Sequence, residues 1–343
     1  MKALVLPPNS QNISRAAALL QKGEVVGMPT ETVYGLAGIL FDEQALSKIF
    51  SSKERPTFDP LIAHVATQNF SDLENLGIIQ SSSLSESAKE TVSRLISTFW
   101  PGALTLVLPK TKKVPDLATS GLDTVAIRMP NHPVALELIR AAGAPLAAPS
   151  ANRFGRISPT QAAHVVSELG DRIELILDGG PCSIGVESTV VRVDASGKVF
   201  MLRPGGVSVQ DLERCLGARV EKETSSQLAS PGMLESHYAP TKPLYLLESL
   251  PKKTARSVGF LAAQKADAQK IQQIEAKLGE KPSFVQILSA RGNTEEAARN
   301  LFSFLRELDQ SPVECLVAES WPSSEGLGHA INDRLQKASH PKL

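Results

Sequence analysis

The stretch that decides the fold is VVGMPTETVYGLAGILFDEQALSKIFSSKERP, residues 25–56. It predicts a buried strand at residues 25–26, a polar turn at 29–32 and a run of small residues at 33–38. A helix follows, because Asp42 is a good N-cap and apolar residues recur at helical spacing at 45, 46, 49 and 50. Lys53 and Arg55 stand at the end of this helix.

Two interpretations fit this stretch. Threonine hydroxyls at the end of a strand, with two cations one helix later, suit an anionic substrate bound at the edge of a sheet. The alternative is an ordinary βα unit with a solvated basic helix end, because the last turn of a helix favours Lys and Arg in any case. The stretch alone leaves both open.

The composition indicates a globular protein with room for two domains. The chain has 343 residues, of which 42% are hydrophobic and 21% charged. Lys+Arg 36 balances Asp+Glu 36, which argues against a protein whose main task is to grip a phosphate backbone. The cysteines are scattered and show no CxxC spacing, so we expect neither disulfides nor a zinc site. With no signal-peptide core and no membrane-spanning run, a soluble cytoplasmic protein is expected.

The pattern along the chain divides it into three parts. Residues 1–217 are expected to form a first domain, in which 158–160 cap a helix at 161–169 and the strands at 187–193 and 199–202 pair as a hairpin. Residues 218–243 are polar and rich in Pro and Gly, which is typical of a linker. His237 and Tyr238 predict that this linker folds over a cleft. Residues 244–343 alternate strands with helices and predict a small open parallel α/β domain.

Two polar residues interrupt apolar strands. His64 lies inside an apolar run, where a histidine is more often a satisfied core residue than a functional one. Arg128 lies near the end of the strand at 124–130 and needs a partner, because an unpaired buried charge is very costly. Its partner is either an internal carboxylate or a ligand carboxylate held in a fork.

The motifs that are absent narrow the chemistry. The chain lacks a P-loop, a G-x-G-x-x-G turn after a strand, a G-x-S-x-G elbow and an H-E-x-x-H pair. What remains is a set of hydroxyls and cations, namely Thr32, Thr124, Ser150, Ser158 and Ser188 with Lys53, Arg55, Arg128 and Arg203. Such a set binds anions and supplies no activated nucleophile, which favours phosphoryl or nucleotidyl transfer.

These residues stand in motifs that resemble a known family. The motifs are P-T-E-T-V-Y-G-L at 29–36, K-x-R-P at 53–56, D-P-L-I-x-H at 59–64, T-V-A-I-R-M-P at 124–130, P-S-A-N at 149–152, S-P-T at 158–160, G-x-E-S-T-V at 185–190 and R-P-G at 203–205. In this order they resemble the YrdC-like domain of the L-threonylcarbamoyladenylate synthase family. The segment S-P-G-M-x-x-x-H-Y-A-P at 230–240 and the C-terminal unit resemble its longer, two-domain branch.

The resemblance implies a twisted mixed-sheet YrdC-like domain plus a smaller Rossmann-like open parallel α/β domain. It implies a nucleotidyltransferase that makes L-threonylcarbamoyladenylate from L-threonine, bicarbonate and ATP with release of pyrophosphate, with Mg²⁺ accompanying the ATP. The product would serve the synthesis of N6-threonylcarbamoyladenosine in tRNA, through a downstream transferase machinery and with a weak contact to tRNA itself.

The resemblance also assigns roles by motif. It implies an L-threonine pocket formed by Thr32, His64, Arg128, Ala148 and Ser188, with Arg128 on the carboxylate. It implies an ATP site formed by Lys53, Arg55, Asp59, Thr124, Ser150, Asn152, Ser158, Arg203 and Tyr238, with Lys53 and Arg55 in catalysis. Position 59 is often Asn in the family. An Asp there would repel a triphosphate unless Mg²⁺ or Lys53 intervenes.

Three alternatives stay open at this point. The domain could be an RNA-binding module without this catalysis, or part of a carbamoyl-transfer or maturation enzyme, although acylphosphatase and zinc-finger segments are not visible. The C-terminal unit could instead be the functional part. The main interpretation requires Arg128, Lys53 and Arg55 to face a shared hollow. An Arg128 tied to an internal acid, with both other cations turned away, would contradict it.

Overall fold

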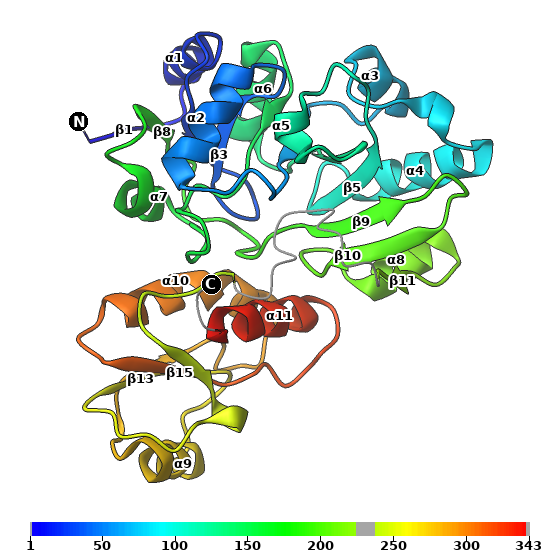
Figure 1. Cartoon of the computed structure of the whole chain (residues 1–343). Helices are drawn as coiled ribbons and strands as arrows, with labels where there is room; N and C mark the ends of the chain where they lie inside the picture. The colour runs from blue at the N-terminus through cyan, green and yellow to red at the C-terminus, as the bar shows by residue number, and fades with distance from the viewer. Residues whose placement is uncertain (1, 224–236, 341–343) are drawn as a thin grey trace. The chain divides into compact units, whose positions relative to one another are not determined.

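The computed structural model describes residues 2–223 and 237–340 (Figure 1). It comprises two compact units. The first is Met1–Phe154, Pro159–Ser183 and Glu187–Met233, and the second is Gly155–Ser158, Ile184–Val186 and Leu234–Leu343. Residues 224–236, within the predicted linker, fall outside the described residues. Within the described ranges, none of the helices has the length and hydropathy needed to span a bilayer.

An 11-stranded mixed sheet organises the first unit, in the order β1-β8-β2-β3-β7-β4-β6-β5-β9-β10-β11. The strands are β1 (Leu4–Leu6), β2 (Val26–Met28), β3 (Gly35–Ile39), β4 (Ile62–His64), β5 (Leu104–Pro109), β6 (Thr124–Arg128), β7 (Leu146–Ala147), β8 (Leu175–Leu177), β9 (Thr189–Val193), β10 (Val199–Arg203) and β11 (Glu221–Lys222). The helices are α1 (Ser10–Leu20), α2 (Glu43–Lys53), α3 (Phe70–Asn75), α4 (Glu86–Phe99), α5 (Asp116–Thr119), α6 (Pro133–Ala142), α7 (Ala162–Leu169) and α8 (Val209–Leu216), with a 3-10 turn at Ser81–Ser83.

The larger core covers one face of the middle strands. Register places Ala63 of β4 and Leu106 of β5 beside Ile127 of β6, so these side chains share a face. Helices α2 and α4 bury their apolar stripes against this face. A second core lies between α1, α6 and strands β2 and β8. The helix α2 begins as predicted, because the Asp42 carboxylate accepts hydrogen bonds from the backbone N–H groups of Gln44 and Ala45.

Several local predictions can be compared with the structure. The hairpin of β9 and β10 is confirmed as an antiparallel pair. The predicted cap of α7 at 158–160 is wrong: the N-cap is Gln161, whose side chain makes no capping hydrogen bond. Thr160 instead lies against the ring of His164, whose Nδ1 accepts its backbone N–H at 3.2 Å. The small-residue run at 33–38 contains β3, which pairs with β2 on one side and β7 on the other.

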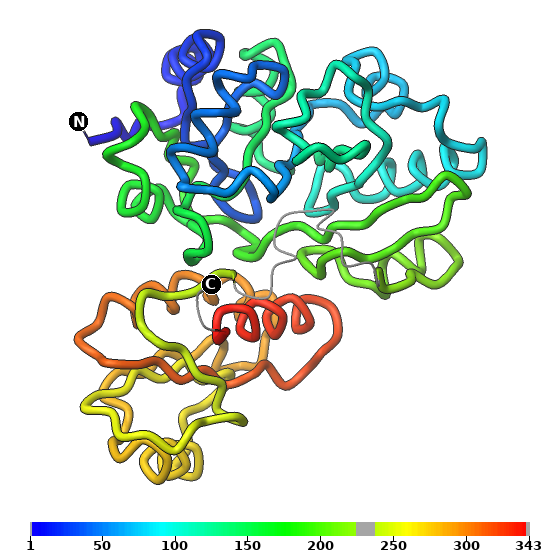
Figure 2. Tube along the Cα trace, in the orientation of Figure 1, coloured from blue at the N-terminus to red at the C-terminus, as the bar shows by residue number. Residues whose placement is uncertain are grey.

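The second unit is a small parallel α/β domain, traced from yellow to red in Figure 2. Its four strands run in the order β12-β15-β13-β14, and every pairing among them is parallel, as predicted. The elements are β12 (Leu244–Leu246), a 3-10 turn (Leu247–Ser249), β13 (Val258–Ala262), α9 (Ala268–Leu278), β14 (Pro282–Ile287), α10 (Thr294–Gln310), β15 (Cys315–Ala318) and α11 (Leu327–Ser339). Phe260 and Val317 lie at the centre of its core.

Candidate active site

The second face of the middle strands carries a large share of the predicted site residues. In β6, Thr124 and Arg128 alternate with the core residues and therefore point to this other face. His64 of β4 is paired in register with Arg128, and Arg203 of β10 with Val190 of β9. A small apolar cluster forms the surface between them: Ile62, Val107, Ala126 and Val190. Chain segments far apart in sequence thus place polar groups on one sheet face.

The Arg128 guanidinium lies in a buried polar group at the end of β6. Its Nη1 donates to Thr32 Oγ1 at 2.8 Å and its Nε to the carbonyl of Gly102 at 3.1 Å. Its Nη2 forms an ion pair with Glu31 Oε1 at 2.7 Å, and both side chains are buried. Of the two partners that the sequence left open for Arg128, the structure shows the internal carboxylate. Glu31 was missed, although its place in the P-T-E-T motif was a signal.

His64 lies beside this group in a neutral state. Its Nδ1 lies 3.1 Å from the carbonyl oxygen of Ile62. Burial and the neighbouring positive charge of Arg128 lower the pKa of His64 to about 3. A neutral imidazole next to a guanidinium adds no further positive charge to the site at neutral pH, and it can exchange a hydrogen bond with an uncharged hydroxyl.

We expect His64 to make the protein less stable in acid. The unfolded chain takes up a proton near the ordinary His value of 6.5, whereas the folded chain does so only near 3. The contribution of the neutral ring to the free energy of unfolding is therefore fully present above about pH 6.5. It is lost as the pH falls toward 3, at about 1.4 kcal/mol per pH unit. Urea unfolding at pH 6.5 and 4.5 measures this loss. In His64→Gln the difference between the two pH values should shrink by about 2 kcal/mol. An unchanged difference would show that His64 titrates normally.

A second polar group lies at the other end of β4 and β6. Arg55 closes the loop before β4: its Nε donates to the carbonyl of Asp59 at 3.0 Å and its Nη2 to that of Pro60 at 2.8 Å. The Asp59 carboxylate lies 2.9 Å from Arg55 Nη2 in a buried ion pair. Thr124 begins β6 and Arg128 ends it, four residues further along the strand. Thr124 and Arg128 are thus separated by about 13 Å along the strand.

Asp59 sits among cations. Burial raises the pKa of Asp59, while the positive charges of Arg55, Lys53 and Arg203, in that order, act to lower it. The neighbour that neutralises Asp59 directly is Arg55, rather than the Lys53 or Mg²⁺ considered from the sequence. Three cations therefore act on Asp59, while the negative charge of Glu168 also acts on Lys53.

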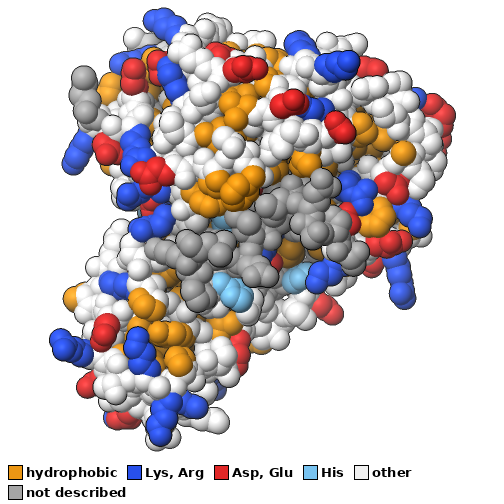
Figure 3. All heavy atoms as spheres, in the orientation of Figure 1, with side chains coloured by type: hydrophobic (Ala, Val, Ile, Leu, Met, Phe, Trp, Pro, Cys, Tyr) orange, Lys and Arg blue, Asp and Glu red, His pale blue; other side chains and the backbone are white. Residues whose placement is uncertain are grey.

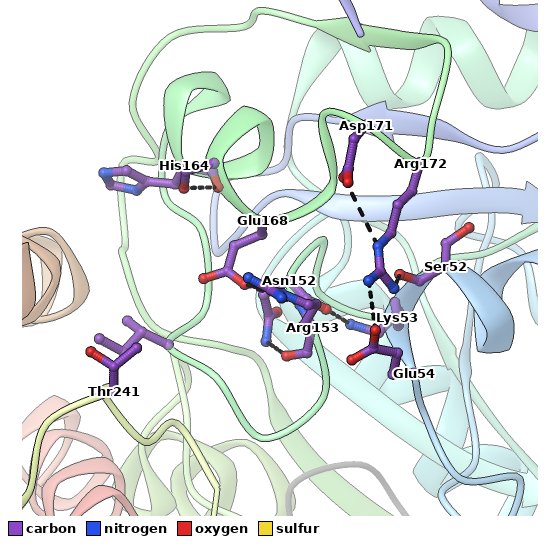
Figure 4. Close-up of polar contacts among 12 residues, drawn as sticks. Ser52, Lys53, Glu54, Asn152, Arg153, His164, Glu168, Asp171, Arg172 and Thr241 are labelled. Atoms are coloured by element: carbon purple, nitrogen blue, oxygen red, sulfur yellow. Dashed lines mark hydrogen bonds and ion pairs between the residues drawn. The ribbon is translucent and has the colours of Figure 1, made fainter. Parts of the chain in front are cut away.

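Lys53 ends helix α2 and is buried. Its ammonium donates to the backbone carbonyls of Ser150 and Asn152, and Figure 4 shows it pointing toward the backbone of Asn152. Burial, with Arg55 nearby, lowers the pKa of Lys53 well below its ordinary value. A lysine in this state favours an added anion, because a negative charge nearby would restore its charged form.

Arg172 holds the end of α2 in place and was not predicted. Its guanidinium donates to the carbonyl of Ser52 at 3.1 Å and pairs with Glu54 at 2.5 Å (Figure 4). Glu54 is the helix C-cap and has a left-handed backbone conformation. This contact lies at the turn that carries Lys53 and Arg55. Sequence offered no signal for it, because Arg172 lies in a loop more than a hundred residues away.

Arg203 at the end of β10 and Ser188 just before β9 connect these two strands. Arg203 Nη2 donates to the carbonyl of Ser188 at 2.9 Å, and Ser188 Oγ lies 2.7 Å from Thr105 Oγ1. Gly205 makes this close contact possible, because a Cβ there would overlap the backbone of Ser188. The R-P-G motif therefore works through backbone packing as well as through its arginine.

The other predicted residues divide between the two units. Ala148 is buried in the first unit, and its N–H donates to the carbonyl of Ile62 at 3.0 Å. Ser158 and Tyr238 belong to the second unit. Tyr238 is buried, and its backbone φ is 64°. The centroid of its ring lies 5.6 Å from that of Phe302. The predicted contact of Tyr238 with ATP stays a prediction.

The two conditions that would contradict the main interpretation are met only in part. Arg128 is tied to an internal acid, Glu31. Lys53 donates to backbone carbonyls of Ser150 and Asn152, and Arg55 pairs with Asp59. That both face a hollow shared with Arg128 stays a prediction. Over the visible face, basic and acidic side chains are interspersed rather than gathered in a basic band (Figure 3). This distribution weighs against a phosphate-backbone binding surface.

A mixed sheet with a cation- and hydroxyl-bearing face, followed by a small parallel α/β unit, defines a two-domain YrdC-like protein. Two family models match the chain: one described as "Telomere recombination" over residues 18–205, and one described as "Threonylcarbamoyl-AMP synthase, C-terminal domain" over residues 207–340. The chain belongs to the threonylcarbamoyl-AMP synthase family.

Relatives match over nearly the full length. The chain is 43% identical to the threonylcarbamoyl-AMP synthase of Bacillus subtilis, covering 97% of this chain and 94% of the relative. It is 40% identical to that of Pyrococcus abyssi, covering 94% and 93%. The solved structure of P. abyssi Sua5 complexed with L-threonine superposes with a TM-score of 0.81 at 37% identity, covering 96% and 95%. The predicted family, fold class and enzyme class are confirmed.

Proposed function

We propose that this protein makes L-threonylcarbamoyladenylate from L-threonine, bicarbonate and ATP, with release of pyrophosphate. The observation that carries the proposal is the sheet face itself. One face of β6 presents Arg128 at one end, next to His64 of β4, and Thr124 at the other end. This spacing suits one extended intermediate that joins an amino acid to a nucleotide.

The Arg128 end is the proposed threonine site. Arg128 presents a buried guanidinium, flanked by Thr32 and the neutral ring of His64. A guanidinium is the group best suited to bind a carboxylate with more than one hydrogen bond. The complex of the P. abyssi relative with L-threonine supports this substrate. Ser188 and the backbone at Ala148 complete the proposed pocket.

The Asp59 end is the proposed nucleotide site. Arg55 pairs with Asp59 there, and the charges of Lys53 and Arg203 also act on this carboxylate. The backbone that carries Ser150 and Asn152 is held by Lys53. Phosphates placed among these cations would find positive charge on several sides. The ATP-binding roles of Ser158 and Tyr238, which belong to the second unit, stay predictions.

The chemistry requires positioning and charge stabilisation above all. The amine of threonine condenses with bicarbonate to give N-carboxythreonine and water. A carbamate oxygen then bonds to the α-phosphorus of ATP, and the bond from that phosphorus to the bridging oxygen breaks, so pyrophosphate leaves. Lys53 and Arg55 stabilise the negative charge that develops on the phosphates. Lys53 thus needs its charged form, which a bound phosphate favours.

Mg²⁺ enters this proposal as part of the ATP substrate. The described residues contain no group of three or more His, Cys, Asp or Glu side chains that could hold a metal ion. Asp59, the acid of the proposed nucleotide site, is already paired with Arg55. These residues therefore fit a metal ion held mainly by phosphate oxygens and do not fit a resident metal centre.

The proposal is tested by pyrophosphate release. We expect the purified protein to release pyrophosphate from ATP only when both L-threonine and bicarbonate are present. Omitting either one should reduce release to background, because the carbamate is the attacking group. Equal release without the two co-substrates would indicate a plain ATP-hydrolysing activity and would refute the proposal.

The product leads to a role in tRNA modification. A threonylcarbamoyl group activated as an adenylate is suited to transfer to an adenosine amine, so a tRNA threonylcarbamoyl transferase is the proposed consumer, with at most a weak direct contact to tRNA. The cysteines Cys182, Cys215 and Cys315 are free thiols. This supports a reducing compartment, and we place the reaction in the cytoplasm.

A further inference from the structure

Glu31 is a buried acid in the turn between β2 and β3. Only 5% of its surface is exposed. Its Oε1 lies 2.7 Å from Arg128 Nη2, which accounts for one of its two carboxylate oxygens. The other oxygen, Oε2, is buried and has no hydrogen-bond partner among the described residues. An unpaired carboxylate oxygen inside a protein is costly, so a donor at this position would stabilise the site.

Neighbouring groups do not supply this donor within the described part of the chain. The other contacts of Arg128 go to Thr32 and to the carbonyl of Gly102. Burial lowers the pKa of His132 and raises that of Cys182, and the charge of Glu31 acts on both groups. Neither of them bonds to the Glu31 carboxylate. Oε2 of Glu31 therefore lies next to the Arg128 guanidinium and accepts no hydrogen bond from the described residues.

We infer that Glu31 binds the α-ammonium group of the amino-acid substrate, while Arg128 beside it binds the α-carboxylate. This inference rests on the proposed function and names a further residue of the same site. A guanidinium and a carboxylate held 2.7 Å apart are complementary in charge to an α-amino acid, which carries a carboxylate and an ammonium on one carbon. Oε2 accepts the ammonium N–H that the protein does not provide.

The pairing gives the site a basis for selectivity. A carboxylic acid that lacks the amine can use Arg128 but leaves Oε2 of Glu31 unpaired. A hydrogen bond to a charged group in a buried site corresponds to a difference of about 10-fold or more in affinity. Glu31 is thus a substrate-binding residue that distinguishes L-threonine from hydroxy acids of the same shape.

The test compares two ligands on two proteins. Calorimetric titration measures the affinity of the full-length protein for L-threonine and for (R)-3-hydroxybutyrate, which lacks only the α-amino group. We expect the wild type to prefer L-threonine by about 10-fold or more. In Glu31→Gln the preference should fall to about 2-fold or less, with binding of (R)-3-hydroxybutyrate retained. Glu74→Gln is the matched control: this acid of α3 accepts a hydrogen bond from Ser81 at 2.6 Å, and its loss should leave the preference unchanged.

Each outcome decides between explanations. If Glu31 is only the counter-ion of Arg128, Glu31→Gln weakens both ligands equally, the preference persists and the inference is overturned. If the wild type does not bind L-threonine at all, the proposed function itself fails. Should Glu31→Gln not fold, Glu31→Asp retains the negative charge but shortens the reach. Glu31→Asp should also lose the preference for L-threonine. If this variant keeps the preference, the inference is overturned as well.

Discussion

Replacing Lys53 with Met is expected to reduce pyrophosphate release by about 100-fold or more, the loss typical when a group that stabilises transition-state charge is removed. Lys53 is 1% exposed, and its ammonium is directed at the backbone that carries Ser150 and Asn152. Met retains the length of the side chain and removes the charge. The loss should therefore appear in turnover and in the dependence on ATP, and not in the affinity for L-threonine.

Lys48→Met provides the control for Lys53. Lys48 is on the same helix, is about a third exposed and pairs with Glu24 on the surface, so its loss should change the rate less than about 2-fold. Arg55→Ala should also abolish activity. It is a less direct test, because Arg55 also holds the loop of Asp59 and Pro60. A folded Lys53→Met protein with more than a third of wild-type activity would remove Lys53 from the catalytic role.

Replacing Arg128 with Met is expected to abolish L-threonine binding and to destabilise the protein. The first effect follows from loss of the only group proposed to bind the substrate carboxylate. The second follows because Glu31 remains buried without its partner, which costs about 3–5 kcal/mol. Calorimetric titration with L-threonine and urea unfolding measure the two effects separately.

A double variant separates binding from stability. Arg128→Met combined with Glu31→Gln removes both charges, so most of the lost stability should return while L-threonine binding stays absent. ATP should bind the double variant within about 3-fold of the wild type, because Thr124 lies about 13 Å from Arg128 along β6. A double variant that binds L-threonine like the wild type would show that Arg128 serves only the internal ion pair.

Much of the fold could be predicted because the signals are local. Asp42 and the apolar spacing after it specify α2, and the alternation in T-V-A-I-R specifies which face of β6 carries Arg128. The helix α7 could not be placed as well, because its N-terminus is fixed by the contact of Thr160 with His164 and not by a side-chain cap. Strand β3 is rich in small residues, and its extended conformation depends on pairing with β2 and β7.

The candidate site shows the same limit. The sequence identified the residue types, but partners depend on the register between strands distant in sequence. The ion pair of Arg128 with Glu31 joins segments almost a hundred residues apart, and Arg172 reaches α2 from a similar distance. The alternatives for Arg128 therefore stayed open until the geometry was known. Motifs indicated that Asp59 departs from the usual amide, whereas only the structure shows Arg55 as its partner.

The identity of the product tests the central claim most directly. The protein is incubated with ATP, L-threonine and ¹³C-labelled bicarbonate, and the nucleotide product is examined at once by mass spectrometry. We predict a single adduct that contains AMP, one threonine and one labelled carbon, with one pyrophosphate released for each adduct. Formation of ADP and phosphate, or of an adenylate without the labelled carbon, would contradict the account.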